Sequence, residues 1–188
     1  MKFKVITAAT PEPVTLAEAR LQCKADSDNT SHDAVLTSLI TAAREFAEHY
    51  TGLALAPVTL EAALDEFPCD DWIDLPMPPV ASVTHIKYTD TAGAEQTLDS
   101  GDYALSTYEL SRRVNLAYGA TWPSTQDVAD AVRVRFVTGY TTVPKAVKAA
   151  LLLHIEIESP INPHTPAERA DLERARDSLL NTVKVWGF

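Results

Sequence analysis

Hydrophobic residues spaced three and four apart mark the first part of the chain. The longest such pattern predicts an amphipathic helix, and its apolar positions are Val35, Leu36, Leu39, Ile40, Ala43, Phe46, Ala47 and Tyr50. Gly52 follows as a C-terminal stop signal. Upstream, Thr15-Leu16-Ala17-Glu18 has the pattern of a capping box. We therefore expect a short helix from this box to about Cys23, followed by the longer one.

The same spacing returns in the last quarter of the chain. Pro144 suits the first turn of a helix, and Val147 to Ile157 is apolar on nearly every side, which predicts burial by its own domain or by neighbouring subunits. Thr165-Pro166-Ala167-Glu168 is a second capping box and predicts the start of a final helix. The chain then ends in the apolar tail Val185-Trp186-Gly187-Phe188.

Between these helical patterns the hydrophobic period shortens towards two. The predicted strands are Val58 to Leu64, Val83 to Thr89, Glu95 to Leu98, Tyr103 to Ser106, Arg113 to Ala117 and Val132 to Val137, with a turn at Asp90 to Gly93. We expect an α+β fold in which the helical regions 14–52 and 144–186 form one bundle and a β-rich region of about 57–140 is inserted. The prediction is a single domain over residues 1–188.

Composition narrows the possible partners. The chain has 188 residues, a formal net charge of -10 and a pI near 4.9, which disfavours a protein that grips nucleic acid by neutralising phosphates. The longest apolar stretch, Ala149 to Ile155, is far too short to span a membrane, so no membrane partner is expected. Cys23 and Cys69 lack zinc-type spacing and are predicted to be reduced thiols.

Residues able to support catalysis are sparse. The five histidines lie apart from any nucleophile motif, and no phosphate-binding glycine loop occurs. The prediction is therefore no catalytic residue, no metal ligand and no cofactor. His154 lies in an apolar helical segment, and we interpret it as a satisfied core or interface histidine in preference to a ligand or base. Trp122 is interpreted as an anchor within a turn.

Acidic residues are concentrated between Arg44 and Lys87, where eight acids occur without any Lys or Arg. A calcium site is disfavoured because the segment from Asp65 to Asp71 lacks the glycine and the alternating oxygen ligands of a calcium loop. A solvated acidic face is the preferred interpretation. A third possibility is that the acids line a channel through which DNA slides without sticking.

The order and spacing of several segments resemble the head-tail connector, or adaptor, family of long-tailed phages, prophages and gene-transfer agents. The segments that carry this resemblance are Val14 to Arg20, Leu39 to Gly52, Ile73 to Val80, Gly101 to Tyr103, Tyr118 to Pro123, Val132 to Tyr140, Val143-Pro144 and Lys184 to Phe188. One departure is Glu158 to Pro166, where members of the family often carry an aromatic-rich helix end.

The resemblance implies a non-enzymatic structural protein of the virion, located at the head-tail junction and assembled in the host cytoplasm. It implies a ring of about twelve copies beneath the portal, built from head-to-tail contacts. The implied partners are the portal protein on one side and a stopper or tail-completion protein on the other. The ring would extend the channel, so that packaged double-stranded DNA passes through without specific binding.

Two sets of residues are candidates for these contacts. For packing between subunits we expect the apolar helix positions Leu151, Leu152, Leu153 and Ile155. For docking on the portal we expect Val185, Trp186 and Phe188. Two alternatives stay open: a small metal-dependent hydrolase that uses His154 or the acids from Asp65 to Asp74, and a monomeric protein-binding module whose β region is the recognition surface.

Overall fold

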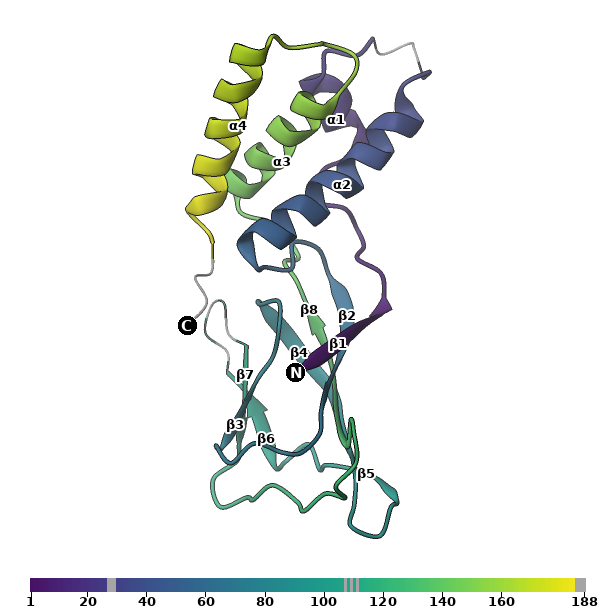
Figure 1. Ribbon diagram of the computed structural model, residues 1–188, viewed down its shortest axis with the longest axis vertical. Helices are drawn as coiled ribbons and strands as arrows, with labels where there is room; N and C mark the ends of the chain where they lie inside the picture. Colours follow the sequence, from purple (N-terminus) through teal and green to yellow (C-terminus); the bar gives the residue numbers. More distant parts are fainter. Residues whose placement is uncertain (27–29, 107, 109, 111, 185–188) are drawn as a thin grey trace. The chain divides into compact units, whose positions relative to one another are not determined.

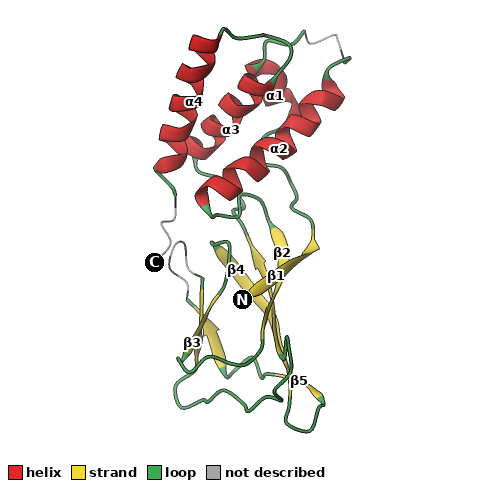
Figure 2. Ribbon diagram, viewed as in Figure 1, coloured by secondary structure: helices red, strands yellow, loops and turns green. Residues whose placement is uncertain are grey.

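The computed structural model describes residues 1–26, 30–106, 108, 110 and 112–184. Its chain forms two compact units (Figures 1 and 2). The β unit comprises Met1–Thr10 and Pro57–Tyr140, and the helical unit comprises Pro11–Ala56 and Thr141–Phe188. The α+β fold class is confirmed, with helices from both ends of the chain gathered in one unit. That these two units act as a single domain stays a prediction.

The helical unit contains α1 (Leu16–Gln22), α2 (Asp33–Thr51), α3 (Lys145–Glu158) and α4 (Pro166–Asn181). Both predicted capping boxes are present: the hydroxyls of Thr15 and Thr165 accept from the backbone N–H groups three residues on, and Glu18 and Glu168 reach back to the caps. Gly52 ends α2 in the left-handed conformation, at φ 75°. These helix ends follow from interactions within a few residues.

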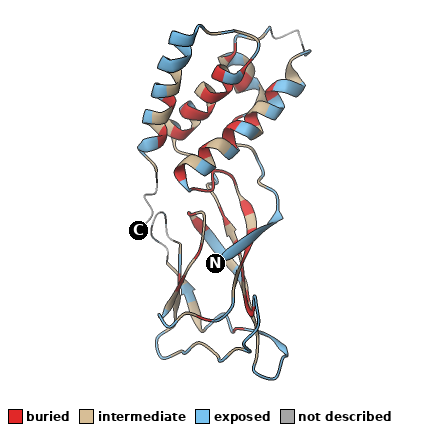
Figure 3. Cartoon of the chain, in the orientation of Figure 1, coloured by how far each residue is buried: buried red, intermediate tan, exposed pale blue. Residues whose placement is uncertain are grey.

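Helix α3 supplies much of the core of the helical unit and contacts the other three helices (Figure 3). Its buried residues are Val147, Ala150, Leu151, His154, Ile155 and Ile157. Helix α4 buries only Arg176 and Leu180. Its other side chains are more accessible, as expected for a helix with one packed stripe. Between α3 and α4, the side-chain amide of Asn162 donates to the carbonyl of Cys23, so the segment that departs from the family pattern is fixed against the end of α1.

The β unit contains two antiparallel sheets. The larger has the order β1-β2-β8-β4-β5, from β1 (Lys2–Thr7), β2 (Val58–Leu64), β8 (Val132–Thr138), β4 (Val80–Thr89) and β5 (Glu95–Thr97). The smaller has the order β3-β7-β6, from β3 (Trp72–Asp74), β7 (Arg113–Leu116) and β6 (Tyr103–Leu105). The predicted strands are all present, with ends that differ by at most a few residues.

Buried apolar and partly exposed polar side chains alternate along the strands, and the buried ones form the core of the β unit. Val132, Val134 and Phe136 of β8 are fully buried, while Arg133 and Arg135 on its other face remain partly exposed. The turn predicted between β4 and β5 is also confirmed. There the carboxylate of Asp90 accepts from the backbone N–H groups of Ala92 and Ala94, and Gly93 has φ 84°.

Two strands were missed by the sequence analysis. Strand β1 pairs with β2 and belongs to the β unit, so that unit is more than an insertion between helices. Strand β3 is three residues long and pairs with β7. Strand β3 is too short to show a period, whereas β1 carries an alternation from Lys2 to Val5 that was not identified as a strand.

Candidate interaction surfaces

The described residues do not assemble a metal site. Among them, no group of three or more His, Cys, Asp or Glu side chains is placed to hold an ion. Several acids of the acidic segment are already engaged elsewhere. The Asp65 carboxylate accepts from the backbone N–H of Asp130 at 2.9 Å, and Asp74 lies 2.9 Å from Arg113. In the part of the chain that is described, no helix is long and apolar enough to cross a membrane.

His154 occupies the core of the helical unit. Its ring stacks on Phe46 of α2 at 4.4 Å between centroids, and its Nδ1 lies 3.1 Å from Nη1 of Arg176 on α4. Because a guanidinium can only donate, Nδ1 is the acceptor and the ring is neutral. Burial, followed by the positive charge of Arg176, lowers the pKa of His154. The interpretation of His154 as a satisfied core histidine is confirmed.

Trp122 also has a packing role, as expected. Its ring stacks on Phe67 at 4.9 Å between centroids, and its Nε1 donates to the carbonyl of Asp70 at 2.9 Å. The two contacts hold the loop before β3 against the segment that precedes β8. Cys69, next to Asp70, is an exposed free thiol, and Cys23 is a buried one.

The four residues expected at a subunit interface fall into two pairs. Leu151 and Ile155 are 2% and 0% exposed and pack inside the helical unit. Leu152 and Leu153 are only partly buried. Only this second pair offers surface to a neighbouring molecule. The tail residues Val185, Trp186 and Phe188 lie outside the described residues, so their role in docking stays a prediction.

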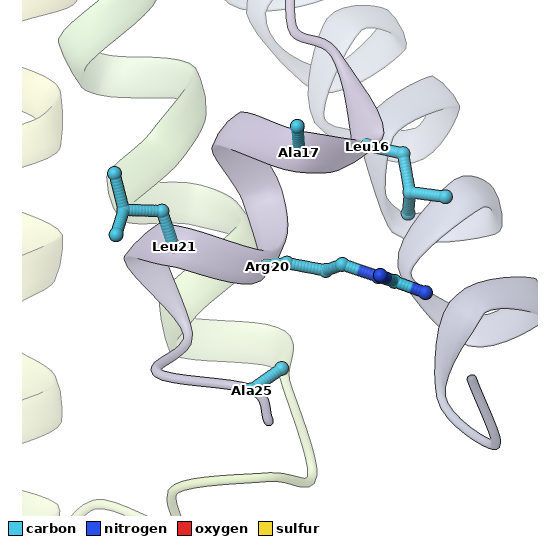
Figure 4. A pocket seen from close by; sticks show the side chains of 5 residues that line it. All are labelled: Leu16, Ala17, Arg20, Leu21 and Ala25. Atoms are coloured by element: carbon cyan, nitrogen blue, oxygen red, sulfur yellow. The ribbon is translucent and has the colours of Figure 1, made fainter. Parts of the chain in front are cut away.

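Helix α1 borders an apolar hollow of about 450 Å³, lined by Leu16, Ala17, Arg20, Leu21 and Ala25 (Figure 4). Leu21 is 81% exposed. Arg20 extends towards α2, where its Nε donates to Asp33 at 2.7 Å. Apart from Arg20, the lining residues are apolar, which suits packing against another surface.

A second surface lies along β1 in the β unit. Every residue of this strand is exposed. We call Met1, Phe3, Val5 and Ile6, together with Lys2 and Lys4, the β1 surface. The four apolar side chains are 58%, 49%, 59% and 39% exposed, respectively. Sequence reasoning missed this surface, although the alternation of Lys and apolar residues from Lys2 to Val5 is a signal for a strand.

The charged face beside β1 is organised around Glu61 of β2. Its carboxylate lies 2.8 Å from Lys4 Nζ and 2.6 Å from Arg135 Nη2, and its side chain is 6% exposed. Burial acts to raise the pKa of Glu61, but hydrogen bonds from Lys4 and Arg135 outweigh it and lower the pKa. This carboxylate therefore connects β1 to β2 and β8 through charge as well as through backbone pairing.

Solved structures from gene-transfer-agent particles have a similar fold. A chain from the neck of an empty GTA particle computed with C6 symmetry matches with a TM-score of 0.77 and 23% identity, covering 100% of this chain and 97% of that one. A chain from the virion of a native gene transfer agent particle matches at 0.76 and 24%, with the same coverage. A chain from the neck of a native GTA particle computed with C12 symmetry matches at 0.75 and 23%, again with that coverage.

Sequence comparison gives the family. No curated protein is similar enough in sequence to match the chain. A family model, that of the phage gp6-like head-tail connector protein, matches residues 13–110, which is more than half of the 188 residues. This match covers α1, α2 and the strands from β2 to β6. The chain therefore belongs to the phage gp6-like head-tail connector family.

Proposed function

We propose that this protein forms a ring of twelve copies at the neck of a virion or a gene-transfer-agent particle, beneath the portal. The observation that carries the proposal is family membership over more than half of the chain. It is supported by a fold that is similar, over the whole length of the chain, to that of neck subunits. One of those necks was computed with C12 symmetry, which supports the copy number.

The work of such a ring is mechanical. It binds the portal protein on one side and receives a stopper or tail-completion protein on the other. Packaged DNA passes through its channel. A net charge of -10 fits this passage, because like-charge repulsion keeps phosphates from adhering to the wall. No catalytic step forms part of the proposal.

Two surfaces carry the contacts in this proposal. Leu152 and Leu153 are partly exposed leucines of α3 and pack against a neighbouring subunit. The tail residues Val185, Trp186 and Phe188 dock on the portal, since aromatic anchors contribute strongly to protein interfaces. Assembly takes place in the host cytoplasm, before the completed particle is released.

Deletion of the gene in the producing host tests the function. The expected result, seen by electron microscopy, is a population of separate heads and tails, with joined particles restored by the wild-type gene on a plasmid. Cryo-electron microscopy of the restored necks then counts the copies. Normal joined particles in the deletion strain would contradict the proposal, and a neck with a different symmetry would contradict only the copy number.

A further inference from the structure

Strand β1 has a free edge. It is the terminal strand of the larger sheet and pairs with β2 alone among the described strands. Its outer backbone N–H and C=O groups are therefore available to a further strand. Exposed edges of this kind pair readily with another chain unless charge, proline or a covering segment blocks them. The sequence from Lys2 to Thr7 contains no proline, and its two lysines, Lys2 and Lys4, disfavour pairing with a neutral or basic strand but not with an acidic one.

The apolar side chains of β1 continue the buried face of the sheet but are themselves exposed. Phe3 lies opposite Ala62, and the same row continues through Val134 to Ile86. Those last three residues are all 0% exposed, whereas Phe3 is 49% exposed. A second row starts at Val5, opposite Leu60. Both rows belong to the buried face of the sheet. Their residues are buried in the inner strands, but Phe3 and Val5 at the β1 end are exposed.

Apolar exposure is concentrated on this strand. Of the ten large hydrophobic side chains that are exposed among the described residues, four belong to Met1, Phe3, Val5 and Ile6. Single exposed apolar residues are ordinary, but a contiguous group bordered by charges marks an interaction site. A hollow of about 170 Å³ opens on the charged side of the same strand, where Glu61, Asp130 and Arg133 join Lys2 and Lys4 in its lining.

The charge of the β1 surface identifies a complementary partner. Lys2 and Lys4 are 77% and 66% exposed, and β1 has no acidic residue, although the chain carries a net charge of -10. Lys2 lies 3.8 Å from Asp130 and Lys4 lies 2.8 Å from Glu61, yet both side chains keep most of their surface accessible. A surface with this charge fits an acidic strand edge.

The chain itself has such an edge. Strand β3 is the terminal strand of the smaller sheet, so its outer edge has no strand partner among the described strands. Two exposed acids, Asp70 and Asp71, precede it directly, and Asp74 ends it. The β1 surface and the β3 edge are thus complementary both in backbone hydrogen bonding and in charge.

We infer that β1 is the edge by which one copy of this protein joins the next, pairing along β3 of the neighbouring copy. Lys2 and Lys4 then lie beside the acidic segment Asp70-Asp71 of that copy, and Phe3 and Val5, on the opposite face of β1, become partly covered by the added strand. This inference rests on the proposed function, because a contact between two different surfaces repeats head to tail and closes into a ring. It uses the same strand-addition chemistry as peptide binding at sheet edges.

A disulfide between copies tests the contact in assembled particles. Cys69 is naturally exposed and adjoins Asp70, so Lys2→Cys places a second thiol opposite it across the inferred interface. Purified particles that carry this variant are treated with copper phenanthroline and separated without reducing agent. The expected result is a ladder of covalent dimers, trimers and larger species.

Two controls accompany the ladder. Cys69→Ser in the Lys2→Cys background should abolish it, and Leu21→Cys, at a site that is 81% exposed, should give none. Particles that contain the Lys2→Cys chain without a ladder overturn the inference, as does a ladder that survives Cys69→Ser. A wild-type chain that is absent from the neck overturns the proposed function instead, so the two failures are distinguishable.

A second variant tests the apolar part of the surface. Phe3→Lys together with Val5→Lys places charges at positions that are already about half exposed, so the chain should fold with an unfolding midpoint close to that of wild type. The expected result is at least a tenfold loss of incorporation into necks, measured by quantitative mass spectrometry. The matched control is Val35→Lys with Val128→Lys, at two exposed apolar positions elsewhere. Equal incorporation of the β1 variant and the control would overturn the inference.

Discussion

Arg176 donates a hydrogen bond to Nδ1 of His154 across 3.1 Å, and its guanidinium lies over the ring of Phe46, 4.4 Å from the centroid. Arg176 and His154 are each 9% exposed. One cation therefore joins α4 to both α3 and α2. Its charge is balanced by the carboxylate of Asp177, 2.8 Å from Nε.

Arg176→Met should lower the free energy of unfolding by about 1–3 kcal/mol, because it leaves the buried Nδ1 of His154 without a donor while keeping most of the side-chain volume. Urea denaturation followed by circular dichroism measures the change. Arg174→Met is the matched control on the same helix, since Arg174 is 77% exposed and its ion pair with Asp171 adds little. Equal effects of the two variants would show that the hydrogen bond to His154 has no special weight.

Stability should fall as the pH is lowered from about 7 to about 5, and His154 should contribute to that fall. Its folded pKa lies below the ordinary value of 6.5, so the unfolded chain binds more protons in this range. Proton uptake therefore favours unfolding once the pH drops through 6.5. His154→Asn should reduce the slope of the free energy of unfolding against pH, because the amide oxygen can still accept from Arg176 but the side chain cannot titrate.

His85 contributes to the same pH dependence. Its pKa is also lowered, by burial and by the charge of Arg135, and it remains in the His154→Asn variant. The difference between wild type and variant isolates His154. Urea denaturation midpoints, measured between about pH 5 and 7, give this slope. If wild type and His154→Asn have the same slope, His154 has the same pKa in the folded and the unfolded chain.

Thr165→Ala should cost about 1 kcal/mol of stability by removing the cap of α4. The Thr165 hydroxyl accepts from the backbone N–H of Glu168 at 3.4 Å and donates to its carboxylate at 2.7 Å. Thr165→Ser retains the hydroxyl and serves as the control. If serine destabilises as much as alanine, the methyl group and not the cap is responsible.

Glu61→Gln should weaken the attachment of β1 to the rest of the sheet. The substitution removes the negative charge that Lys4 and Arg135 share, and a charged hydrogen bond of this kind contributes about 1.5–3 kcal/mol. Hydrogen exchange should accelerate in the amides of Lys2 to Thr7 more than in those of β8. Glu95→Gln is the control, because Glu95 pairs with Lys87 and Arg133 on the same sheet without contacting β1. Exchange that is unchanged in β1 would contradict the role of Glu61.

A chain that ends at Thr182 should fold and fail to join heads to tails, because it lacks the apolar tail that we propose docks on the portal. Particle joining is counted by electron microscopy after complementation of the deletion strain. Trp186→Ala with Phe188→Ala keeps the chain length and should give the same defect. Normal joining by both variants would exclude the tail from docking.

The helical unit could be predicted in outline because its signals are local. The capping boxes at Thr15 and Thr165 and the stop at Gly52 depend on contacts within four residues, which a sequence pattern contains. The turn from Asp90 to Gly93 was predictable for the same reason. The order of these elements also carried the resemblance to head-tail connectors, and the match over residues 13–110 confirmed the family.

The candidate surfaces depended on tertiary structure. The run from Leu151 to Ile155 is uniformly apolar in sequence, and only packing against the other helices distinguishes the buried pair from the partly exposed Leu152 and Leu153. Likewise, the alternation from Lys2 to Val5 does not reveal what the segment pairs with, because the strand is stabilised by a partner that lies more than fifty residues away in the chain. Composition and local pattern thus determined the helices, the turn and the family, while long-range pairing decided which apolar residues are left for another copy to cover.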